Sequence, residues 1–150
     1  GHPADTLHFH GRFPYRGLSR VCGGLEHWGR TLFGFRAPQI EHPLADGQTL
    51  DFWGGIQVLH TPGHTVGHCS FYSLKHDLLF SGDLFANWLP RVMLPWPWLN
   101  SCPEKFPASI RKVLDLNPSG ILANHCDKAD PATQATRFQK RFASYRLQQQ

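Results

Sequence analysis

Three side chains that are far apart in the sequence have the chemistry of metal ligands, and each follows a short apolar run. His64 follows a run that ends in Thr-Pro-Gly, Asp83 follows Leu-Leu-Phe-Ser-Gly, and His125 follows Gly-Ile-Leu-Ala-Asn. Imidazole nitrogens and carboxylate oxygens suit zinc and its first-row relatives, and one carboxylate can bridge two ions. If the three side chains meet, they form the ligands of a metal centre.

The segments that carry these side chains are predicted to be β-strands. Over residues 56–60, Ile, Val and His alternate with Gln and Leu, which favours a half-buried strand. Pro62 lacks an N–H donor and Gly63 tolerates unusual backbone angles, so the strand ends before His64. Further strands are predicted over residues 49–53, 69–74, 78–81 and 120–123.

The run Thr-Pro-Gly-His-Thr-x-Gly-His at residues 61–68, followed by an apolar strand that ends in Gly-Asp, resembles the metallo-β-lactamase superfamily, which includes glyoxalase II. The resemblance covers residues 44–126. It implies that His64 binds metal, that Asp83 bridges two metals as the catalytic candidate, and that His125 binds the second metal. It also implies an α/β fold, an αββα sandwich of two mixed sheets with helices outside. The expected cofactor is zinc, as one or two ions, with iron or manganese as alternatives.

Each of these residues also has a plain structural interpretation. His64 could be an ordinary surface histidine, Asp83 could cap the turn after Gly82, and His125 could pack at a strand end. The motif favours the ligand role for all three. His68 is expected to support the site instead of binding metal, because the resemblance gives the ligand role to His64.

The superfamily's second signature, His-x-His-x-Asp-His, has no intact copy here. Residues 1–6 resemble its end, with His2 near the second His and Asp5 near the Asp, but the spacing is one residue too long. We therefore expect one metallo-β-lactamase-like domain over residues 1–150 that is N-terminally truncated or degenerate, with His2, Asp5 or His8 as further candidate ligands. A disordered polar terminus is the alternative. A missing layer would favour self-association or a completing chain.

An apolar segment rich in Trp and Pro follows Asp83 directly. Because prolines interrupt residues 84–100, we expect irregular structure that shapes an apolar pocket beside the metal site, with Trp88 influencing substrate choice. Core or interface packing is the alternative.

Helices are expected on both sides of the last strand. Ser101 and Glu104 have the form of a capping box ahead of an apolar stripe that begins at Phe106. Asp130 and Pro131 are typical of a helix start. The glycines within residues 21–36 predict only a short helix or a loop there.

Composition narrows the functional classes. The 150 residues carry a formal net charge of +4 and are 41% hydrophobic, which suits a single packed domain. The chain shows no membrane-spanning run and no signal-peptide pattern, so a cytoplasmic location is expected. The four cysteines lack a Cys-x-x-Cys pair, which favours free thiols. The basic excess is too small to predict a nucleic-acid partner, and a small-molecule substrate is expected.

The sequence therefore predicts a metal-dependent hydrolase in which a metal-activated water attacks an ester, thioester, amide or phosphoester. The alternative is a catalytically impaired or non-catalytic binding module with the same fold, because the His-rich motif is not intact. A metal site needs about three protein ligands, and His64, Asp83 and His125 supply two for each ion. We therefore expect the 150-residue chain to bind metal weakly and to be a poor catalyst.

Overall fold

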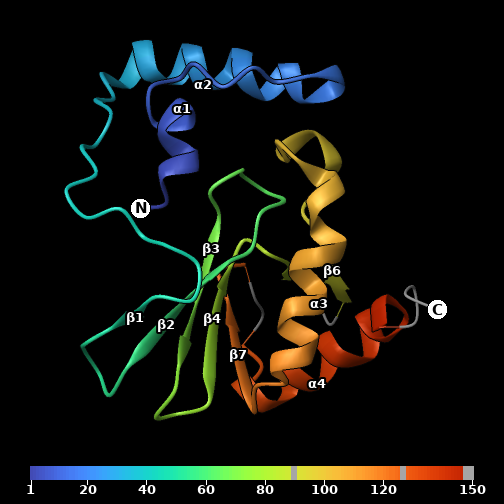
Figure 1. The fold of residues 1–150 in the computed structure, drawn as a ribbon. Helices are drawn as coiled ribbons and strands as arrows, with labels where there is room; N and C mark the ends of the chain where they lie inside the picture. Colours follow the sequence, from blue (N-terminus) through green and yellow to red (C-terminus); the bar gives the residue numbers. More distant parts are fainter. Residues whose placement is uncertain (89–90, 126–127, 147–150) are drawn as a thin grey trace.

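A five-stranded mixed sheet forms the centre of the molecule in the computed structural model, which describes residues 1–88, 91–125 and 128–146 (Figure 1). The strand order is β1-β2-β3-β4-β7, with only the β4–β7 pair parallel. The strands are β1 (Thr49–Leu50), β2 (Ile56–His60), β3 (Cys69–Ser73), β4 (Leu78–Gly82) and β7 (Gly120–Ala123). They lie where the sequence predicts them. Only β1 is clearly shorter than expected, because Trp53, Gly54 and Gly55 all take positive φ and turn the chain.

Three strands of this sheet point the same way. β2 is antiparallel to β3, β3 is antiparallel to β4, and β4 is parallel to β7, so β2, β4 and β7 end at the same edge. Val58, Phe71, Phe80 and Leu122 lie side by side in one row across the four strands. The segments that leave β2, β4 and β7 carry His64, Asp83 and His125. The topology thus brings the three predicted ligands to one edge.

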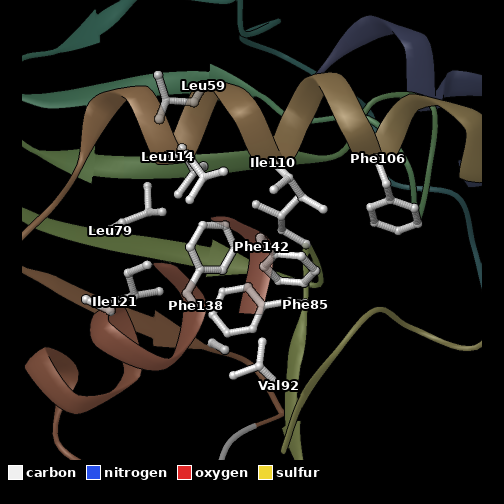
Figure 2. Close-up of a cluster of buried hydrophobic side chains, with 14 residues drawn as sticks. Leu59, Leu79, Phe85, Val92, Phe106, Ile110, Leu114, Ile121, Phe138 and Phe142 are labelled. Atoms are coloured by element: carbon white, nitrogen blue, oxygen red, sulfur yellow. The ribbon is translucent and has the colours of Figure 1, made fainter. Parts of the chain in front are cut away.

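Helices α3 (Phe106–Leu116) and α4 (Pro131–Phe142) pack with the sheet around one hydrophobic core (Figure 2). Burying a Leu, Ile or Phe side chain fully contributes about 1.5–3 kcal/mol each, so this core anchors the sheet edge that bears the site. Its buried residues come from both helices, the sheet and the segment after Asp83: Leu59, Leu79, Leu84, Phe85, Val92, Phe106, Ile110, Val113, Leu114, Ile121, Ala123, Ala135, Phe138 and Phe142.

The two helix starts differ in how well the sequence predicts them. The Asp130 carboxylate accepts a hydrogen bond from the Thr133 N–H (2.9 Å) and Pro131 opens α4, as predicted. The predicted capping box at Ser101 is wrong. A 3₁₀ turn, η4 (Pro103–Lys105), precedes α3, and the Ser101 hydroxyl donates to the His64 carbonyl instead (3.1 Å).

The N-terminal region is more helical than the sequence suggests. It contains η1 (Pro3–Asp5), α1 (Thr6–Phe9), η2 (Gly17–Ser19) and the 14-residue helix α2 (Arg20–Phe33), where only a short helix or loop is predicted. Glu26 and Arg30 form an ion pair (2.8 Å) one turn apart, and the Arg30 guanidinium donates to the Phe9 carbonyl (2.6 Å). These contacts hold α2 against α1 and offset the poor helix propensity of its glycines.

The η2 turn and helix α2 expose an apolar stripe, which comprises Leu18 of η2 and Val21, Leu25, Trp28 and Leu32 of α2. These residues recur at alternating spacings of three and four and are 58–74% exposed. None of the residues of α2 is buried. The stripe is therefore an apolar helix face that the described part of the chain leaves uncovered.

The segment after Asp83 is partly regular. β5 (Ala86–Trp88) and β6 (Arg91–Met93) form a two-stranded antiparallel sheet, followed by η3 (Pro97–Leu99). The expectation of a wholly irregular segment is therefore wrong, because the chain pairs before it reaches Pro95 and Pro97. The last element is η5 (Ala143–Arg146). In the described ranges, no helix has the length and apolar character needed to cross a bilayer.

Candidate metal centre

Asp83 lies between the two predicted histidine ligands. Its Oδ2 atom is 3.9 Å from His64 Nε2, and its Oδ1 atom is 3.5 Å from His125 Nε2. Both distances exceed those of a hydrogen bond between these groups. The His64 and Asp83 side chains are each 27% exposed, whereas that of His125 is 70% exposed. Each carboxylate oxygen therefore faces a different histidine.

The loop that carries His64 is held from its backbone. The Ser101 N–H donates to the His64 carbonyl (2.9 Å), and the Cys102 N–H donates to the Gly63 carbonyl (3.2 Å). The buried Ser109 hydroxyl on α3 donates to the Pro62 carbonyl (2.7 Å). This loop is therefore fixed to the start of α3, which is itself anchored in the core.

Asn100 fixes the orientation and tautomer of His64. Its Nδ2 group donates to the carbonyls of Pro95 (2.8 Å) and Trp96 (3.0 Å), so its Oδ1 atom must face the His64 ring. That oxygen lies 3.1 Å from His64 Nδ1 and accepts its proton. In the neutral ring, Nε2 then carries a lone pair that faces Asp83. A second hydrogen bond of this kind is typical of a metal-binding histidine.

Asp83 is fixed from the opposite side by His68. The Asp83 N–H donates to His68 Nε2 (2.9 Å), and His68 Nδ1 donates to the Thr61 carbonyl (2.9 Å). Burial disfavours the charged ring and lowers the pKa of His68, so it remains a neutral acceptor. Gly82 has φ +56°, and a Cβ there would lie 2.7 Å from His68 Nε2. His68 thus contacts the backbone of Asp83, the supporting position that we expect for it.

Each of the two His–Asp pairs has a spacing that suits the binding of one metal ion. Two atoms that each bond zinc at about 2.0–2.1 Å can be at most roughly 4 Å apart, and both pairs satisfy this limit. His64 Nε2 and Asp83 Oδ2, two atoms that can each donate a lone pair to a metal ion, also face each other. Nevertheless, in the ranges 1–88, 91–125 and 128–146, no three His, Cys, Asp or Glu side chains form a complete ligand cluster. The structure holds two His–Asp pairs that share Asp83.

The N-terminal candidates are engaged elsewhere. His2 stacks on His60 with ring centres 4.0 Å apart. The Asp5 carboxylate accepts hydrogen bonds from the Gly67 N–H (2.7 Å) and the Thr65 hydroxyl (2.9 Å), which ties η1 to the loop after His64.

His8 is buried beside these elements. The Tyr15 hydroxyl donates to Glu26 (3.0 Å) and accepts from His8 Nδ1 (3.2 Å). His8 Nε2 is therefore a buried acceptor, and it has no hydrogen-bond partner among the described residues. Asp5 and His8 act in the structure as packing and hydrogen-bonding residues of η1 and α1, and the polar terminus is ordered around them.

An apolar pocket of about 190 Å³ borders Asp83 and His125. Its remaining walls come from Phe85, Ala86, residues 93–96 and Leu99. The predicted pocket beside Asp83 is therefore present. The side chain of Trp88, which we expect to influence substrate choice, lies outside the described part of the structure, as does Cys126.

Sequence reasoning missed two asparagines. Asn100 orients His64, and the Asn124 amide donates to Asp83 Oδ1 (3.2 Å). Asn124 directly precedes His125, so its position next to a predicted ligand was a usable signal. Asn100 comes 36 residues after His64, and no spacing rule connects the two.

The family model of the metallo-beta-lactamase superfamily matches residues 2–119, and the chain belongs to this superfamily. Hydroxyacylglutathione hydrolase of Rhodobacter capsulatus is 41% identical over 54 residues, which are 35% of this chain and 21% of that protein. Hydroxyacylglutathione hydrolase of Rhizobium meliloti (strain 1021) is 34% identical over 88 residues, which are 54% of this chain and 33% of that protein. The predicted family is thereby confirmed.

Solved structures of the superfamily share the fold. Metallo-beta-lactamase family protein TTHA1429 from Thermus thermophilus superposes with a TM-score of 0.64 at 24% identity, covering 97% of this chain and 52% of that chain. TTHA1623 in a di-iron-bound form gives a TM-score of 0.59 at 25% identity, covering 89% and 60%. The α/β fold class is thus confirmed. The chain spans about a third or less of these curated relatives and a little over half of these solved structures.

Proposed function

We propose that this chain carries the metal-binding edge of a metal-dependent hydrolase, with His64, Asp83 and His125 as ligands. One observation carries the proposal: the two Asp83 oxygens face two different histidine nitrogens, at 3.9 and 3.5 Å. A carboxylate that presents one oxygen to each side is suited to bridge two ions. Asp83 is accordingly the proposed catalytic residue.

The residues of the chain have separate tasks in this proposal. A bound metal ion supplies Lewis acidity and lowers the pKa of water towards about 7. Asn100 keeps the Nε2 lone pair of His64 directed at Asp83, and His68 keeps Asp83 in place through its N–H. The apolar walls of the pocket cover Asp83 on one side and lower the local polarity there, which strengthens electrostatic interactions at this carboxylate.

A thioester or ester of a small molecule is the substrate class that we favour. The hydroxyacylglutathione hydrolases among the relatives support this class, with amides and phosphoesters as alternatives. We propose zinc as the metal, as one or two ions, with iron or manganese as alternatives, and the di-iron form of TTHA1623 supports the iron alternative. Cys22, Cys69 and Cys102 are free thiols, which supports a reducing, cytoplasmic location.

We further propose that residues 1–150 form one domain whose α2 stripe is covered by self-association or by a completing chain. The uncovered apolar stripe supports this, since large exposed apolar surfaces mark interaction sites. Sedimentation at increasing concentration tests the first possibility. A sedimentation coefficient that stays at the value of a monomer over the whole concentration range would exclude self-association.

A non-catalytic binding module is the second candidate function. The incomplete ligand cluster in the described ranges favours it, because an ion held by only two protein groups is bound weakly. The two candidates differ in their metal-dependent turnover.

The test combines metal uptake with hydrolysis. Equilibrium dialysis against zinc, iron or manganese is compared for the wild type, Asp83→Asn and the control Asp51→Asn, an exposed carboxylate outside the site. We expect weak uptake by the wild type and the control, loss of uptake in Asp83→Asn, and metal-dependent hydrolysis of thioesters near the detection limit. Equal uptake by Asp83→Asn and the wild type would refute the assigned ligands. Uptake without any turnover would favour the binding module.

A further inference from the structure

The pocket beside Asp83 and His125 has only one polar end. Asp83 and His125 border it on that side, and the other wall residues that the structure describes are apolar. Phe85 and Ala86 are buried in the protein, whereas Trp96 and Leu99 are 52% and 45% exposed. The pocket is therefore a short apolar cavity that opens beside the proposed reacting centre.

We propose that this pocket binds an uncharged hydrocarbon group of about six carbons, attached next to the scissile bond of the substrate. The size follows from volume, because an apolar cavity of about 150 Å³ holds one benzene molecule and this pocket has about 190 Å³. The position of this group next to a scissile bond rests on the proposed function. The binding of a hydrocarbon group in the pocket does not depend on it.

The chemistry of the walls excludes a polar occupant. A charged or hydrogen-bonding group beyond the Asp83 end would lose water and gain no partner from Phe85, Met93 or Leu94, which is costly. A hydrocarbon chain gains by leaving water, and each buried methylene contributes enough to tighten binding about fourfold. Selectivity is therefore expected to follow chain length.

Asn100 couples the pocket to the site. The two carbonyls that it binds belong to Pro95 and Trp96 in the pocket wall, and its oxygen holds His64. One buried side chain thus sets the distance between the wall and the proposed ligand. An occupant of the pocket is therefore held in a fixed position relative to His64 and Asp83.

The first experiment uses the metal-free chain and neutral straight-chain alcohols. Met93 is the only methionine, so its methyl resonance reports binding at the pocket without ambiguity. We expect the dissociation constant to fall about fourfold per methylene from propanol to hexanol and then to level off. The absence of a chain-length dependence at the Met93 methyl would overturn the proposal.

The second experiment uses the zinc-loaded chain and two series of thioesters. One series lengthens the acyl group from two to ten carbons with a fixed thiol, and the other lengthens the thiol with a fixed acetyl group. A rise in kcat/KM with an optimum near six carbons in either series supports the proposal and shows which side of the bond enters the pocket. If alcohols bind but nothing is hydrolysed, the pocket stands and the proposed function fails. If thioesters are hydrolysed but kcat/KM does not depend on chain length in either series, and alcohols do not bind, the pocket proposal fails and the proposed function stands.

Variants give the matched comparison. Ala86→Leu adds three carbons to the wall, so the optimum should move about three carbons shorter. Trp96→Ala removes an apolar wall and should weaken hexanol binding at least fourfold. Trp53→Ala is the control, because Trp53 is also 52% exposed but contacts His76 and Phe80. Equal weakening by both tryptophan variants would overturn the assignment, and thermal unfolding checks that each variant is folded.

Discussion

The substitution Asn100→Ala should change both the orientation of His64 and the stability of the chain, and the two effects can be measured separately. Asn100 is buried and makes three side-chain hydrogen bonds, to Pro95, Trp96 and His64. At about 1 kcal/mol for each net hydrogen bond, their loss should cost about 3 kcal/mol of unfolding free energy. Loss of the partner of a ligating histidine typically weakens metal binding by about 10–100-fold. The zinc affinity of the folded variant, corrected for any unfolded fraction, should therefore fall by about 10–100-fold.

The assay reads the tautomer of His64 directly. Nitrogen-15 NMR of the neutral His64 ring in the metal-free wild type should show a proton on Nδ1 and none on Nε2, and in Asn100→Ala the neutral ring should populate both tautomers. Asn87→Ala is the control, because Asn87 is also buried but bonds Gln134. An unchanged His64 tautomer in Asn100→Ala, or an equal loss of zinc affinity in Asn87→Ala, would refute the reasoning.

Three other substitutions test the supports of the site. Gly82→Ala places a side chain at φ +56° against His68 and should cost at least about 1–2 kcal/mol in urea denaturation; unchanged stability would contradict the geometry. Ser109→Ala removes the buried hydrogen bond to Pro62 and should cost about 1 kcal/mol, whereas Ser109→Thr should retain part of it. Burial lowers the pKa of His8, so the unfolded state binds a proton that the folded state does not. Stability is then complete above pH 6.5 and falls below it, by at most about 1.4 kcal/mol per pH unit, and a wild type no more acid-sensitive than His8→Phe would contradict this.

The strands and the edge of the site could be predicted from sequence because their signals are local. Alternation over residues 56–60 and the Pro62-Gly63 break specify where a strand ends, and the Gly-Asp at residues 82–83 does the same for the next. The start of α4 is equally local, since Asp130 caps its own helix.

The missed features depend on contacts between distant segments. Helix α2 forms in spite of its glycines because Arg30 bonds α1, and Ser101 does not cap α3 because the 3₁₀ turn η4 separates it from the start of that helix. Asn100 is uninformative in sequence, since only the fold brings it to His64, 36 residues earlier, although its other two partners, residues 95 and 96, are local. Local patterns identify the ligand candidates, but not the residues that hold them in place.

The parallel pairing of β4 with β7 has a consequence for the order of folding. β2, β3 and β4 are joined through residues 61–68 and 74–77, whereas β7 reaches β4 only after residues 83–119. Closing the longer loop costs more chain entropy, and contacts between distant residues form late. We therefore expect the β2–β4 meander, which carries His64 and Asp83, to assemble first, and His125 to arrive when β7 docks. In pulse-labelled refolding, amides of β3 should become protected from exchange before those of β7.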